Sequence, residues 1–182
     1  MWREDDPVAD APTQPKRVAV IGIGNALAGD DGAGVAVVEA LRLRLGEAPG
    51  VLLERLDGDL FAVADLLPRV ERFIFVDAVI AQPPGAILRP VPPSPALAPS
   101  LHQTDIGAVM TALAALDLVD PFPRWEVWGI AIDPPQELKE ELSPPVARAV
   151  AALADELARL LGGLSHDDTG CLPASGQGGG PP

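Results

Sequence analysis

The most informative part of the sequence is residues 18–34, which read Val18-Ala-Val-Ile-Gly-Ile-Gly-Asn-Ala-Leu-Ala-Gly-Asp-Asp-Gly-Ala-Gly34. Its continuous apolar start is typical of a buried parallel strand, and the glycines of Gly22-Ile-Gly24 then permit a tight turn into a helix. A dinucleotide-binding loop would have a third glycine where this chain has Leu27. Asp30 and Asp31 follow where backbone N–H groups would otherwise bind an anion. Because two carboxylates repel a pyrophosphate and attract a cation, the loop predicts a metal or proton site.

Strand and helix patterns alternate along the rest of the chain. Strands are expected at about 17–22, 51–56, 72–78, 86–91 and 125–132, and helices at about 33–45, 60–67, 102 or 104–116 and 143–161. Pro68 ends the second helix, and the last begins with Ser143 as N-cap and Pro144 at its first position. This order predicts an α/β fold, a three-layer αβα sandwich with a mostly parallel, about five-stranded twisted sheet.

Length and composition predict one α/β domain between two tails. The 182 residues, 48% of them hydrophobic, can bury a substantial core at residues 16–163. An acidic, proline-bearing segment at 1–15 and a Gly/Pro-rich segment at 164–182 are expected to be disordered. The lone cysteine, Cys171, excludes an intrachain disulfide and favours a reducing compartment.

Charge and hydropathy exclude two classes of partner. The formal net charge of −13 disfavours nucleic acid and anionic membranes, because phosphate contacts need Lys and Arg. The N-terminus lacks the basic and apolar regions of a signal peptide, and no apolar run approaches the roughly 20 residues of a membrane span. We therefore expect a cytoplasmic protein.

Acidic side chains follow the expected strands at the points where those strands end. They are Asp31, Asp57, Asp59, Asp77 and Asp133. Ligands of parallel α/β sheets bind at the carboxyl ends of the strands, and the domain's single histidine, His102, lies at a loop-to-helix transition. Two carboxylates and one imidazole suit a divalent transition metal such as zinc, nickel, cobalt or cadmium. Three protein ligands leave coordination positions open for a substrate.

Each candidate also has a structural interpretation. Asp30 is more simply a helix cap, a role open to Asp31 as well, and Asp77 could accept backbone N–H bonds. Asp57 suits a turn, and Asp59 and Asp133 are more simply solvated loop or cap residues. Three other chemistries are absent: the chain has no Gly-x-Ser-x-Gly elbow, no paired cysteine ligands and no phosphate loop.

Four motifs occur in order along the chain: Gly22-x-Gly-Asn-x-Leu-x-x-Asp-Asp-Gly-x-Gly34, Asp57-Gly, Phe75-Val-Asp77-Ala and Ser100-Leu-His-Gln103. Together they resemble the [NiFe]-hydrogenase maturation endopeptidases over about residues 17–160. The resemblance implies a five-stranded sheet between helical layers. It also implies removal of a C-terminal extension from the hydrogenase large-subunit precursor, once nickel has been inserted.

By the same resemblance, Asp31, Asp77 and His102 form a metal-binding cluster that engages nickel held by the precursor. Zinc or cadmium would fit the same donors. Family members often continue the second motif as Asp-Gly-Gly-Thr, whereas this chain has Asp59 and Leu60 after Gly58.

Two cleavage routes are open at this stage. An aspartic-protease route would need Asp31 and Asp77 to share a proton, whereas metal ligation needs both ionised. In a metal-assisted route the ion would polarise the scissile carbonyl or activate water, with Asp57 as the candidate base. Two alternative functions also remain: a nickel-sensing chaperone that binds the precursor without cutting it, and a nucleotide- or nucleoside-processing enzyme.

Overall fold

The computed structural model describes residues 18–56, 59–91, 103–134, 139 and 141–162. A five-stranded sheet in the order β2-β1-β3-β5-β4 forms its centre. The strands are β1 Val18–Ile23, β2 Val51–Leu56, β3 Arg72–Ile80, β4 Ile87–Val91 and β5 Arg124–Ile132. All neighbours pair in parallel except β4, which runs antiparallel to β5 at the edge of the sheet.

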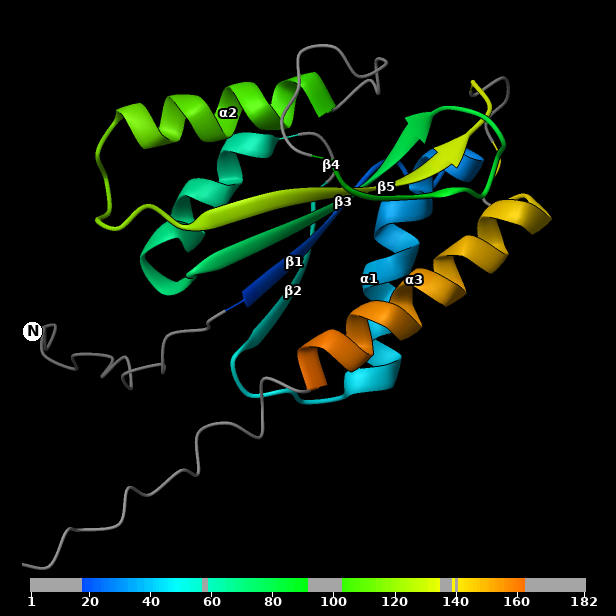
Figure 1. The fold of residues 1–182 in the computed structure, drawn as a ribbon, viewed down its shortest axis with the longest axis horizontal. Helices are drawn as coiled ribbons and strands as arrows, with labels where there is room; N and C mark the ends of the chain where they lie inside the picture. The colour runs from blue at the N-terminus through cyan, green and yellow to red at the C-terminus, as the bar shows by residue number, and fades with distance from the viewer. Residues whose placement is uncertain (1–17, 57–58, 92–102, 135–138, 140, 163–182) are drawn as a thin grey trace, which may run out of the picture.

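Helices cover both faces of this sheet. They are the 3-10 helices η1 Gly29–Gly32 and η2 Leu60–Arg69, and the α-helices α1 Ala33–Leu45, α2 Gln103–Ala115 and α3 Pro144–Gly162. Figure 1 shows α1 and α3 on one face and α2 with η2 on the other. The predicted three-layer αβα sandwich with a mostly parallel sheet is therefore confirmed.

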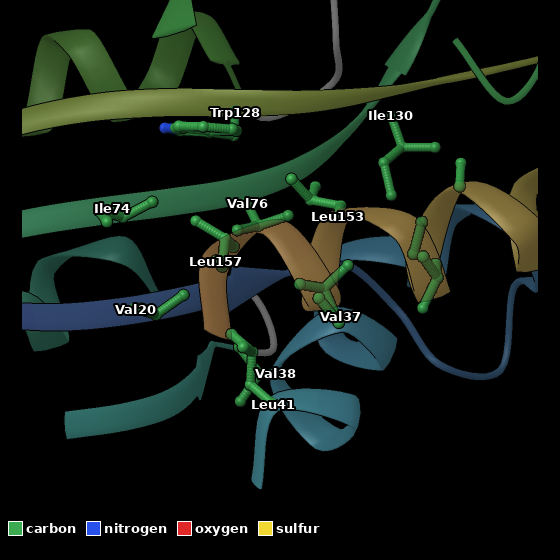
Figure 2. Close-up of a cluster of buried hydrophobic side chains, with 14 of the residues drawn as sticks. Val20, Val37, Val38, Leu41, Ile74, Val76, Trp128, Ile130, Leu153 and Leu157 are labelled. Atoms are coloured by element: carbon green, nitrogen blue, oxygen red, sulfur yellow. The ribbon is translucent and has the colours of Figure 1, made fainter. Parts of the chain in front are cut away.

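The sheet separates two hydrophobic clusters. Val18 and Val20 of β1 pack with α1 and α3, whereas Ala19, Ile21 and Ile23 pack with η2 and α2. Figure 2 shows the first cluster, where side chains of both helices meet those of the strands. Both faces of β1 are covered, and all six of its residues are buried. This explains why the strand is uniformly apolar rather than alternating.

Most elements begin and end within one residue of the expected bounds, and the structure corrects two bounds and one capping residue. The helix expected to stop before Pro68 continues to Arg69, because proline's fixed φ is compatible with a final helical turn. Strand β3 extends to Ile80, since β5 supplies a partner, Ile132, to its last residue. The Ser143 hydroxyl, expected to cap α3, is buried and has no hydrogen-bond partner among the described residues. The first two residues of α3, Pro144 and Pro145, have no N–H, so Val146 is the first residue of the helix that could donate to a cap.

Both tails, 1–15 and 164–182, lie outside the described residues, so the predicted domain bounds remain predictions. Among the described helices, none has the length and apolar character needed to cross a bilayer.

Candidate functional site at the carboxyl edge of the sheet

The sheet has its topological switch point between β1 and β3. From β1 the chain crosses to β2 on one side, and β3 then pairs with β1 on the other side. Crossovers that diverge in this way leave a crevice at the carboxyl ends of the two strands, where parallel α/β proteins bind ligands. Asp31 follows the end of β1 within η1, and Asp77 lies on β3 one residue beyond the Gly22–Val76 pair.

Asp77 is a fully buried carboxylate, with 0% of its surface exposed. Its Oδ1 accepts a hydrogen bond from the N–H of Ala78 at 2.8 Å. Side chains alternate along a strand, so Asp77 lies on the face of Phe73 and Phe75, which η2 and α2 cover. Burying a carboxylate in such an apolar strand is unfavourable unless partners or a cation compensate.

Asp31 is almost as deeply buried, at 8% exposure. The Asn25 N–H donates to its Oδ2 at 3.0 Å, and its Oδ1 has no hydrogen-bond partner among the described residues. The Asn25 side chain accepts from the Leu27 N–H at 2.9 Å, which folds the loop into an Asx turn. Gly24 adopts a φ of +133° and lies so close to the Asp31 carbonyl that a Cβ would collide with it. The loop between β1 and η1 is therefore compact, and it directs Asp31 back over the strand end.

Gly34 sets how closely α1 approaches the sheet. A Cβ at this position would lie 2.9 Å from the Ile23 nitrogen and closer still to the carbonyl oxygens of Ile23 and Val76. The start of α1 thus packs directly on the end of β1 at Ile23 and on the middle of β3 at Val76, and η1 contacts β3. This close packing places the turn of Asp31 beside the strand of Asp77, as the sequence predicted.

Asp30 has a different partner from Asp31. Its Oδ1 accepts a hydrogen bond from the N–H of Ser143 at 2.6 Å, in a part-buried position. The structural interpretation expected Asp30 to cap the helix that follows it, and this was wrong, since neither η1 nor α1 has a side-chain cap. It instead joins η1 to the start of α3. The two adjacent aspartates therefore differ in role: Asp30 is a structural residue, and Asp31 belongs to the candidate site at the switch point.

A second link joins the same loop to the chain before α3. The N–H of Gly29 donates to the carbonyl of Lys139, and Ala28 forms a parallel bridge with Lys139. The sequence placed Asn25 in the first motif without a role for its side chain, and it gave no indication that Lys139 belongs to this region. An asparagine after a strand and a glycine is a signal for the Asx turn, but no local pattern pointed to Lys139.

The remaining predicted residues are distributed as follows. Asp59 is exposed and caps η2 through the Phe61 N–H at 3.0 Å, and Asp133 is exposed and accepts from the Gln82 amide at 2.6 Å. Both therefore have the structural roles considered for them. Asp57 and His102 lie outside the described residues, although α2 begins directly after His102, with its first turn toward the carboxyl ends of the strands (Figure 1).

Within the ranges that the structure describes, no three His, Cys, Asp or Glu side chains form a group able to hold a metal ion. The predicted set needs His102, which lies beyond those ranges, so the role of Asp31, Asp77 and His102 as metal ligands remains a prediction. The donor chemistry fits such a set, because two buried carboxylates are offset by a cation.

Fold and site together define an α/β protein with two buried carboxylates at the switch point of its sheet. No protein-family model and no curated protein sequence matches the chain. Solved structures do: HybD, a [NiFe] hydrogenase maturation protease from Thermococcus kodakarensis, superposes with a TM-score of 0.65 at 25% identity, over 80% of this chain and 99% of that one. The E. coli hydrogenase maturating endopeptidase HybD gives 0.64 at 26% identity, over 81% and 93%.

A third structure, the maturation protease HycI from Thermococcus kodakarensis, shares the fold with a TM-score of 0.57 at 23% identity, over 81% of this chain and 93% of that one. The neighbours at 25% and 26% identity confirm the resemblance to the [NiFe] hydrogenase maturation proteases that the sequence motifs predicted.

Proposed function

We propose that this protein is an endopeptidase that removes the C-terminal extension of a [NiFe]-hydrogenase large-subunit precursor after nickel insertion. The observation that carries the proposal is the likeness to two HybD maturation proteases across nearly the whole length of each. The buried carboxylates of Asp31 and Asp77 at the switch point give this fold a site where chemistry can occur.

Nickel in this proposal belongs to the substrate. The precursor presents a partly coordinated ion, and Asp31, Asp77 and His102 supply the remaining donors. An ion in the crevice would offset the cost of burying two carboxylates, and the Asp31 Oδ1 is available to it. The enzyme would then bind and cleave only a loaded precursor. Zinc or cadmium would occupy the same donors, and the expected compartment is the cytoplasm.

Either cleavage route uses the same two carboxylates in different protonation states. An aspartic route needs one proton shared between Asp31 and Asp77, whereas recognition of nickel needs both side chains ionised. We favour the nickel-dependent state, with Asp57 as the base that activates water. Cleavage that depends on nickel loading would support this choice, and equal cleavage of the empty precursor would support the aspartic route.

A processing assay tests the proposal. The purified protein is incubated with the large-subunit precursor of the same organism, with and without nickel, and the precursor mass is recorded. Loss of a discrete C-terminal segment only from the loaded precursor is expected. Stable binding without cleavage, with nickel incorporation confirmed, would contradict the peptidase and identify a chaperone.

Alanine variants then test the site. Asp31→Ala, Asp77→Ala and His102→Ala are each expected to abolish processing while the circular dichroism spectrum stays native. Asp133→Ala is the matched control, because Asp133 follows a strand of the same sheet but is exposed. Full processing by any one of the three variants would remove that residue from the essential set.

A further inference from the structure

Lys139 lies against the loop that carries Asp30 and Asp31. A Cβ added to Gly29 would lie 2.8 Å from its Cε and 3.0 Å from its Cγ, so the lysine stem passes directly over this glycine. We propose that Lys139 is a substrate-specificity residue, whose ammonium group binds a carboxylate of the peptide segment that is cleaved. This inference rests on the proposed function, and it adds a recognition element that neither Asp31 nor Asp77 supplies.

The backbone of Lys139 is held in place by the loop itself. It pairs with Ala28 in a parallel bridge, and its carbonyl accepts from the N–H of Gly29. Gly29 has a φ of +60° and no side chain, which leaves room for the lysine stem. A stem packed in this way loses less conformational entropy on binding than a freely rotating lysine does.

The charge of Lys139 is not neutralised within the described part of the chain. It forms no ion pair there, and Glu141, two residues further on, is exposed and does not contact it through a salt bridge. By contrast, Arg42, Arg44, Arg55, Arg72 and Arg89 are each paired with an acid. Arg69 lies just before β3 and Arg124 begins β5, so both lie at the amino ends of the strands, opposite the candidate site.

A lysine with no ion pair in the described part of the chain is informative at this position because the chain is acidic. The net charge is −13, and Asp30 and Asp31 lie in the adjacent loop. Without the charge of Lys139, this part of the surface would repel an anionic peptide segment. Leu27, 60% exposed, directly precedes the bridged Ala28 and offers an exposed apolar side chain on the same loop. The fitting ligand is a peptide carboxylate, from either an Asp or Glu side chain or the terminal carboxylate of the extension.

Kinetics of Lys139 variants test the inference. Lys139→Gln should raise KM for the nickel-loaded precursor about two- to fivefold with kcat unchanged, the range expected of an exposed ion pair. Lys139→Arg should restore KM, and the difference should vanish at about 1 M NaCl, where charges are screened. Arg148→Gln is the control, since Arg148 is exposed on α3 and has no ion pair among the described residues. Unchanged KM in Lys139→Gln would overturn the inference.

Two precursor variants separate the sources of the carboxylate. One has the acidic residues of its extension replaced by amides, and the other ends in a C-terminal amide made by ligation. The variant that lacks the true ligand should raise KM as Lys139→Gln does, and combining the two changes should add nothing further. Additive effects in both combinations would overturn the inference.

The proposed function and this inference fail in distinguishable ways. Absence of cleavage by the unaltered protein contradicts the peptidase. Equilibrium binding of the loaded precursor to the wild type and to Lys139→Gln still measures the carboxylate contact in that case. Equal Kd values would then refute the role of Lys139.

Discussion

Replacing Asp30 with alanine separates the roles of two neighbouring aspartates. The Asp30 carboxylate accepts the Ser143 N–H at 2.6 Å and joins the η1 turn to α3, more than one hundred residues later. Alanine leaves that part-buried N–H without its acceptor. Pro144 and Pro145, which follow Ser143, have no N–H, so the next backbone donor after Ser143 is that of Val146.

The magnitude follows from this geometry. A hydrogen bond to a charged group contributes about 1.5–3 kcal/mol, and the part-buried position limits screening by water. For a protein of this size, about 2–4 °C of Tm corresponds to each kcal/mol. Asp30→Ala should therefore lower Tm by about 3–12 °C. Asp30→Asn keeps an oxygen acceptor without the charge and should lose roughly half as much free energy.

Urea denaturation and the processing assay distinguish this role from that of Asp31. Asp30→Ala should lower the urea midpoint yet still cleave the loaded precursor at temperatures where it is folded. Asp31→Ala should lose cleavage under the same conditions. A stability of Asp30→Ala within about 0.5 kcal/mol of the wild type would refute the structural role, because changes of that size are typical of unremarkable surface positions.

Three further changes test the packing that positions the site. Gly34→Ala would force a Cβ against the backbone oxygens of Ile23 and Val76. Thermal melts should therefore show a loss of about 1–3 kcal/mol in the free energy of unfolding, with reduced processing. A neutral effect would mean that α1 does not pack on β1 and β3. Leu153→Ala empties a fully buried position in α3 and should cost about 2–5 kcal/mol by urea denaturation, with cleavage by the folded fraction retained. The Arg44–Asp155 pair that joins α1 to α3 at 2.6 Å is largely exposed, so a double-mutant cycle should give only about 0.2–1 kcal/mol, and a larger coupling would contradict its exposure.

The candidate site was predictable in part. Asp31 follows an apolar strand and Asp77 lies in the carboxyl-terminal half of another, three residues before its end at Ile80. Parallel strands bring their carboxyl ends to one edge, so the sequence pattern predicted their shared location. The sequence assigned Asp30 a structural role apart from Asp31, but the predicted role, a helix cap, was wrong, because its partner, Ser143, lies in a distant segment. Asp59 and Asp133 follow strands of the same sheet, yet the structure gives them hydrogen bonds at the surface, to the Phe61 N–H and the Gln82 amide.

The sequence alone was enough to predict the order of the helices and strands and the αβα class. These properties depend on local periodicity and on glycine positions, both of which act over short stretches of chain. The strand order, the contact of Gly34 with Val76 of β3 and the packing of Lys139 on Gly29 depend on the tertiary structure alone. Those features join segments up to 110 residues apart, and no local pattern of residues encodes which distant backbone group will be the partner.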